Sequence, residues 1–230
     1  MNKHINLNVN PDDLQATARQ VARCFGGTRY RITPRVGRHI EAALNTARGL
    51  IAPAAVFGLY PVKTITSEGR IVLEDGQILA MSCSAGRAEV KFLAATVATL
   101  GIKLEQASRH LAAQGEIYES TLLDAVGTCL LEALADVCRK RLADEARQRN
   151  AFNGIRLAPG LNGCDLTLQE MLIRLSGADR IGVGLTQDYV MTPVKSISMF
   201  SLFTSEPTNQ GDGHKCRHCD LKNCQFRIAT

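Results

Sequence analysis

The stretch YESTLLDAVGTCLLEALADVCRKRLADEAR, residues 118–147, is the longest helical pattern in the chain and sets the fold class. Its apolar residues recur every three or four positions, which is the spacing of one face of an α-helix. These residues are Leu123, Val126, Leu130, Ala133, Leu134 and Val137. Charged residues become frequent towards its end. The stretch therefore predicts a long helix with one apolar face.

Shorter patterns surround this helix. Capping residues and apolar spacing predict further helices over residues 12–24, 38–51 and 103–113, and another after a capping box at Thr167 and Glu170. Strands are predicted over residues 55–59 (limited by Pro61), 70–73, 77–81, 89–99, 180–185 and 194–203, with a loop over 156–164. Strands and helices do not alternate regularly. The sequence therefore predicts an α+β domain with a mainly antiparallel sheet and flanking helices.

Composition narrows the function classes. The chain has 230 residues, of which 45% are hydrophobic and 21% charged, as in ordinary globular proteins. Its apolar runs are shorter than a membrane helix needs, and the first residues lack an apolar signal core, so we expect a cytoplasmic protein without a membrane partner. The net charge of +5 is dispersed and aromatic residues are only 5%. A nucleic-acid partner is therefore not expected.

Eight cysteines in a chain without a secretion signal favour metal or redox chemistry over disulfides. Cys216, Cys219 and Cys224 fall within nine residues and can bind one soft metal ion or an iron–sulfur cluster. A fourth ligand could come from His214, His218 or Cys164. The alternative is three reduced, unligated cysteines. A cluster is favoured over zinc, and we divide the chain into a domain (1–203), a linker (204–213) and a Cys-rich metal-binding tail (214–230).

Two further features could bind a ligand. Arg156-Leu157-Ala158-Pro159-Gly160 suits a carboxylate, because a guanidinium can pair with two oxygens and glycine lets backbone amides approach. Its alternative is an ordinary surface loop. Glu132 lies roughly opposite Leu130 on the helix, so the pattern alone predicts a solvated face. Cys129 and Cys138 are predicted to pack as small apolar residues, and Cys24 has no partner motif.

Taken in order, these segments resemble the activation domain of cobalamin-dependent methionine synthase, in particular its small free-standing form. The resemblance extends from Leu14 to Arg227. It rests on six blocks: Ala54–Pro61, Phe92–Gly101, Leu131–Asp136, Arg156–Gly160, Ile181–Thr186 and Pro193–Ser198. The terminal cysteine motif is similar to the ending of the free-standing form.

The resemblance implies that Glu132, Arg156, Ala158 and Gly160 hold S-adenosylmethionine. The family's loop usually continues with Tyr, where this chain has Leu161, so no role that needs a phenol is expected there. The implied function is reactivation of cobalamin carried by a corrinoid methyltransferase protein, as a methyltransferase-type component, together with an electron donor protein. Two alternatives remain: an iron–sulfur redox module for a corrinoid protein, and an S-adenosylmethionine-dependent methyltransferase with another substrate.

Overall fold

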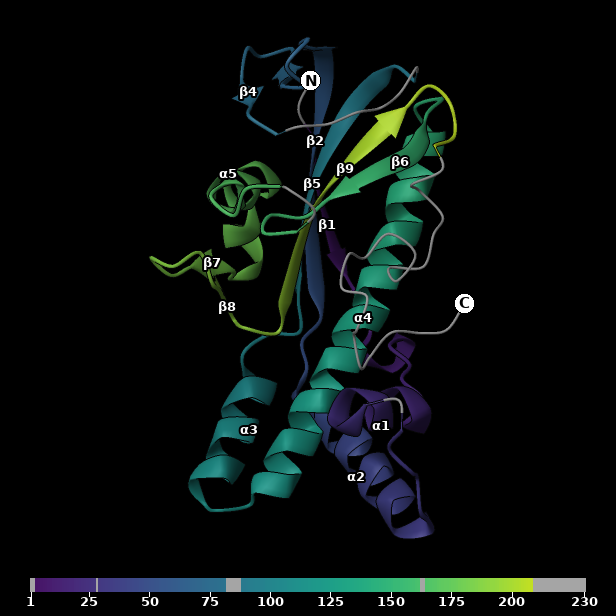
Figure 1. Cartoon of the computed structure of the whole chain (residues 1–230), viewed down its shortest axis with the longest axis vertical. Coiled ribbons are helices and arrows are strands. Elements are labelled where there is room, and N and C mark those ends of the chain that lie inside the picture. The colour runs from purple at the N-terminus through teal and green to yellow at the C-terminus, as the bar shows by residue number, and fades with distance from the viewer. Residues whose placement is uncertain (1–2, 28, 82–87, 162–163, 209–230) are drawn as a thin grey trace.

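A long antiparallel sheet runs through the centre of the molecule (Figure 1). The structure is a computed structural model and describes residues 3–27, 29–81, 88–161 and 164–208. The strand order is β4-β3-β2-β5-β9-β6, and β1 pairs with β2 beside β3. The strands are β1 (Lys3–Asn8), β2 (Ala54–Ile65), β3 (Ile71–Leu73), β4 (Ile78–Leu79), β5 (Val90–Thr99), β6 (Phe152–Leu157) and β9 (Ser196–Thr204). The predicted α+β class with a mainly antiparallel sheet is confirmed.

Helices cover both faces of this sheet. One face carries α1 (Ala18–Gly26), α2 (Pro34–Leu50), α3 (Lys103–Ala113) and α4 (Ile117–Arg147). The opposite face carries α5 (Leu168–Ser176) and the 3-10 helix Ala178–Ile181, followed by the small hairpin of β7 (Gly184–Leu185) and β8 (Met191–Thr192). None of the helices in the described ranges combines the length and apolar composition needed to cross a membrane.

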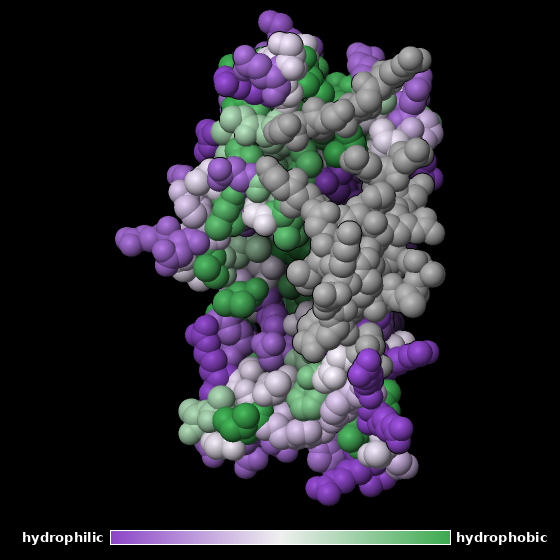
Figure 2. Space-filling model, viewed as in Figure 1, coloured by the Kyte–Doolittle hydropathy of each residue, from purple (hydrophilic) through white to green (hydrophobic). Residues whose placement is uncertain are grey.

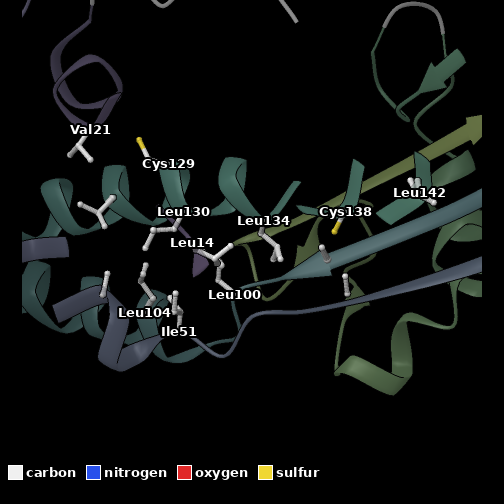
Figure 3. Packing of buried hydrophobic residues seen from close by; sticks show 14 of the residues in the cluster. Leu14, Val21, Ile51, Leu100, Leu104, Cys129, Leu130, Leu134, Cys138 and Leu142 are labelled. Atoms are coloured by element: carbon white, nitrogen blue, oxygen red, sulfur yellow. The ribbon is translucent and has the colours of Figure 1, made fainter. Parts of the chain in front are cut away.

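Alternation along β2 divides the core into two layers. Phe57 and Leu59 face the α1–α4 layer, whereas Val56 and Tyr60 face α5. In the first layer, Leu130 and Leu134 of α4 point towards Leu14 and Leu100 (Figure 3). The long helix therefore packs its predicted apolar stripe onto the sheet and the loops at its end.

Gly58 lets α5 approach the sheet closely. A Cβ at this position would lie 1.9 Å from the carbonyl oxygen of Leu175, which no side chain can tolerate. The same carbonyl accepts a hydrogen bond of 2.8 Å from the Tyr60 hydroxyl. The end of α5 therefore packs directly against the backbone of β2, because Gly58 has no side chain at the point of contact.

The N-terminal helix begins later than the sequence predicts. Pro11–Asp13 forms a separate 3-10 turn, and α1 begins at Ala18. Thr17 and Gln20 form a capping box, in which each side chain bonds the backbone N–H of the other residue. This cap satisfies the Thr17 and Gln20 N–H groups, which have no carbonyl partner within a helix that begins at Ala18.

Three predicted boundaries in the sheet and near α5 are also wrong. β2 continues through Pro61, whose carbonyl accepts from the Glu74 N–H, and the ladder with β3 shifts register beyond it. The capping box expected at Thr167 does not form, because the Asp165 carboxylate accepts from the Thr167 N–H and hydroxyl instead. The strand predicted over 180–185 begins inside the 3-10 helix Ala178–Ile181, and only Gly184–Leu185 is a strand.

Candidate functional site

Arg156 lies near the end of β6, the edge strand of the sheet. Its neighbours Ile155 and Leu157 pack on the α5 side, so alternation directs Arg156 to the α4 side. Its ladder partner is Ser201 of β9. The sequence predicted a loop here, but Arg156 and Leu157 belong to a strand. The guanidinium is therefore carried by a half-buried strand that packs against α4.

Ala158 and Gly160 form the tight turn that follows β6. The Leu161 N–H donates to the Ala158 carbonyl at 3.0 Å, and the Gly160 N–H donates to the Cys164 carbonyl at 2.8 Å. Gly160 has φ +80°, and a Cβ there would lie 3.3 Å from Leu166. This position therefore requires glycine. Leu161, in the place of the family's Tyr, has an exposed fraction of 62%.

Glu132 projects from α4 and is exposed, as the helical pattern alone predicts. It follows Asp124 and Thr128 at a spacing of four residues, so the three side chains succeed one another along the helix surface. Glu132 therefore lies on a helix that packs on one side of the sheet. This helix contacts β6, the strand that carries Arg156.

A buried carboxylate fixes how α4 turns into β6. Glu145, with an exposed fraction of 1%, pairs with Arg141 and Arg149 at 2.7 Å each. The Arg149 guanidinium also lies over the ring of Phe92 on β5, 5.9 Å from its centre. Asn150 then takes a left-handed conformation with φ 53°, and the chain reverses. These contacts hold the end of α4 against the sheet and so set the start of β6.

Two buried hydroxyls on the α4 side of the sheet have no hydrogen-bond partner among the described residues. They belong to Thr96, 1% exposed, and Ser201, 0% exposed. Ser201 stands opposite Arg156, and Thr96 lies on the neighbouring strand β5. A buried hydroxyl without a partner costs about 1–3 kcal/mol. The sheet surface beside Arg156 is therefore more polar than packing requires.

Lys195 is a charged residue that sequence reasoning did not single out. It is 8% exposed, and its Nζ lies 2.9 Å from the Asp124 carboxylate and 3.0 Å from the Thr128 hydroxyl. These partners are the two residues that precede Glu132 on the same helix surface. Lys195 thus joins the start of β9 to α4. It adds a cation to the helix surface that carries Asp124 and Glu132. Its only sequence signal was a charged residue at the start of the apolar strand predicted over 194–203.

The predicted metal ligands Cys216, Cys219 and Cys224 lie outside the described residues. Within the described ranges, no group of three or more His, Cys, Asp or Glu side chains could hold a metal ion. Cys164, one of the three suggested fourth ligands, is buried in the α5-side core, and desolvation raises the pKa of its thiol. Burial keeps the thiol protonated and makes Cys164 a poor ligand as it stands.

Two comparisons relate the chain to known proteins. Residues 83–210 match the family model described as the vitamin B12 dependent methionine synthase, activation domain. A solved structure, the crystal structure of the MetH reactivation domain bound to AdoHcy, is 18% identical with a TM-score of 0.66. The match covers 92% of this chain and 80% of that chain. At this identity the likeness to that structure establishes the fold alone.

Proposed function

The chain belongs to the family of vitamin B12-dependent methionine synthase activation domains, and we propose that it binds S-adenosylmethionine and supports methylation of the cobalamin of a partner protein. The observation that carries the proposal is Arg156, presented by β6 towards the α4 side of the sheet and followed at once by the glycine turn. The ligand in the related AdoHcy-bound structure supports the choice of S-adenosylmethionine.

The charges of the candidate residues fit the two ends of the methionine group. Arg156 can pair its guanidinium with the ligand carboxylate, and Glu132 can accept hydrogen bonds from the ligand ammonium. The turn residues Ala158 and Gly160 offer backbone groups for the adenine end. Although the Ala158 carbonyl accepts from Leu161, it keeps a second lone pair. The Thr96 and Ser201 hydroxyls add polar surface beside Arg156.

The role proposed for this chain is to position the methyl donor. S-adenosylmethionine supplies the methyl group, the partner's reduced cobalamin accepts it, and S-adenosylhomocysteine leaves. An electron donor protein would supply the electron for the reduction. Arg156 and Glu132 fix the methionine group, and the turn fixes the nucleoside, so that the methyl group is held towards the partner. Such catalysis works by proximity, and no side chain of this chain has to give or take a proton.

An exposed apolar face supports docking of a corrinoid protein. Figure 2 shows apolar side chains gathered on the face that carries α5 and the β7–β8 hairpin. The exposed large apolar residues of these segments and of the adjoining turn are Leu161, Leu166, Val190 and Val194. Leu161 directly follows the Gly160 turn. A partner bound on this face would therefore contact the turn after β6, which the proposal assigns to the nucleoside end of the ligand.

We further propose that Cys216, Cys219 and Cys224 bind an iron–sulfur cluster. The support is the sequence spacing, with three thiolates within nine residues flanked by Lys215 and Arg217. A cluster can pass one electron, which is what reduction of an inactive cobalamin needs, whereas zinc has no redox chemistry.

Anaerobic methyl transfer tests the main proposal. The full chain is mixed with a low-potential reductant, methyl-labelled S-adenosylmethionine and the cobalamin-binding region of a cobalamin-dependent methionine synthase. We expect labelled cobalamin and S-adenosylhomocysteine in equal amounts, and far less of both with Arg156→Ala. Label that stays on S-adenosylmethionine with the wild-type chain would contradict the proposal. Label on another acceptor would favour an unrelated methyltransferase.

A further inference from the structure

Cys24 and Cys129 form a thiol pair between two helices. Cys24 lies in the last turn of α1, and Cys129 lies 105 residues later in the first half of α4. Their sulfur atoms are 3.4 Å apart, and the Cys129 S–H donates to the Cys24 sulfur. Figure 3 shows the Cys129 sulfur on the side of α4 nearer Val21 of α1. The pair is part of the packing between these helices.

The two thiols differ in exposure. Cys129 is 4% exposed within the core, whereas Cys24 is half-buried at the edge of the α1–α4 contact. A reagent from solution would therefore meet Cys24 first. The other described cysteines, Cys138 and Cys164, are buried in two separate apolar clusters and provide internal controls.

The surroundings favour a thiolate at Cys24 and a thiol at Cys129. The hydrogen bond from Cys129, opposed by burial, lowers the pKa of Cys24 to about 7. Arg23 and Lys195 also favour the thiolate, and Glu132 opposes it. The same hydrogen bond and burial raise the pKa of Cys129. One sulfur is therefore a nucleophile near neutral pH, and the other is held protonated beside it.

We propose that Cys24 and Cys129 are a reversible oxidation site for low-molecular-weight disulfides. The Cys24 thiolate attacks one sulfur of the disulfide, whose S–S bond breaks and releases one small thiol. Cys129 then loses its proton to solvent and attacks the Cys24 sulfur, releasing the second small thiol. Two protein thiols are oxidised by two electrons, and one small disulfide is reduced to two thiols.

The product is a covalent link between α1 and α4. The sulfur atoms must approach from 3.4 Å to about 2.05 Å, which is a small movement of two side chains already in contact. The link lies one helical turn before Glu132. The site depends only on these two helices and stands whether or not S-adenosylmethionine is the ligand.

Peptide mapping of the oxidised full chain tests this assignment. The protein is fully reduced, freed of reductant anaerobically, treated with oxidised glutathione at pH 7.5, alkylated and digested. Mass spectrometry should find Cys24 and Cys129 in one disulfide-linked peptide, which dithiothreitol separates. Cys129→Ser should stop the reaction at a glutathione adduct on Cys24, while Cys138→Ser should leave the link unchanged. Matching circular dichroism spectra establish that each variant is folded.

Wild-type protein alone can overturn the proposal. Complete alkylation of both cysteines after oxidation, or a stable glutathione adduct on Cys24 without the link, would each contradict it. So would a link from Cys24 to any other cysteine. A second measurement follows the rate of Cys24 alkylation by iodoacetamide between pH 5.5 and 8.5. The rate should rise with a midpoint near pH 7, and a midpoint above pH 8.5 would contradict a thiolate nucleophile.

Discussion

Glu132 is an exposed acid on a long helix, and its proposed role can be separated from the stability of the fold. Glu132→Gln keeps the shape and the helix propensity of the side chain but removes the charge that meets the ligand ammonium. We expect S-adenosylmethionine binding to weaken by about 2 kcal/mol, roughly thirtyfold, with an unchanged melting temperature. Calorimetry and thermal unfolding measure the two effects.

Asp136→Asn is the matched control for Glu132. Asp136 lies one turn further along α4, is exposed, and pairs with Arg139. Its replacement also removes one carboxylate from the helix surface, but we expect no change in ligand affinity. Equal losses of affinity in the two variants would mean that the net charge of α4 matters and that Glu132 makes no specific contact.

Some candidate residues could be proposed from the sequence and others could not. Arg156 was recognised by its charge beside a glycine turn, and Gly160 by the turn itself. Glu132 looks like any exposed helix residue, so only the family resemblance singled it out. The contact between Cys24 and Cys129 joins residues 105 positions apart, and no local spacing encodes such a contact. Lys195 was missed for the same reason, because its partners lie on another element.

The junction between α4 and β6 depends on one buried carboxylate. We expect Glu145→Ala to lower the free energy of unfolding by about 2 kcal/mol, because it leaves Arg141 and Arg149 without their shared partner in a partly buried site. Asp144→Ala removes an exposed pair with Arg147 and should cost about 0.5 kcal/mol. Urea unfolding compares the two. Equal effects would show that Glu145 does not fix the junction.

Long periodic elements were predicted best. Residues 118–147 and 103–113 are helical almost to the predicted boundaries, and strand 89–99 forms β5. Two strands were missed: no element was predicted over β1, and the predicted loop 156–164 overlaps the end of β6. An edge strand such as β6 gains its extended form from its pairing with β9, whose paired residues lie 43 to 52 positions later in the sequence. The pairing of β1 with β2 is also non-local, and local patterns carry no signal for either.

At the level of the molecule, the sheet order could not be read from the chain. The sequence supports an antiparallel sheet, yet it does not say that β9 inserts between β5 and β6 or that β1 and β3 share one edge of β2. The strand order depends on the packing of two core layers, one on each face of the sheet. The α1–α4 layer and the α5 layer become visible only when the alternating faces of β2 and β5 are assigned.

The Cys-rich tail should be separable from the domain that binds the ligand. Deletion of the chain after Gly213 removes Cys216, Cys219 and Cys224 together but leaves the described helices and strands intact. We expect anaerobically purified wild-type protein to carry iron and sulfide and the truncated protein to carry neither. S-adenosylmethionine affinity should change less than twofold.

Metal analysis and calorimetry distinguish the outcomes for the tail. Wild-type protein without iron or zinc would contradict a metal site, and zinc at one per chain would make the site structural. Loss of S-adenosylmethionine binding in the truncated protein would contradict the division of the chain into a ligand-binding domain and a separate tail.

Calorimetric titration of S-adenosylmethionine into wild type and Arg156→Ala tests the central claim most directly. Arg156→Ala should weaken binding by about 2–3 kcal/mol, because it removes a charge-assisted pair with the ligand carboxylate. Arg174→Ala is the control: it removes the same charge from α5, on the opposite face of the sheet, and should bind as the wild type does. Equal affinity of Arg156→Ala and wild type would contradict this site.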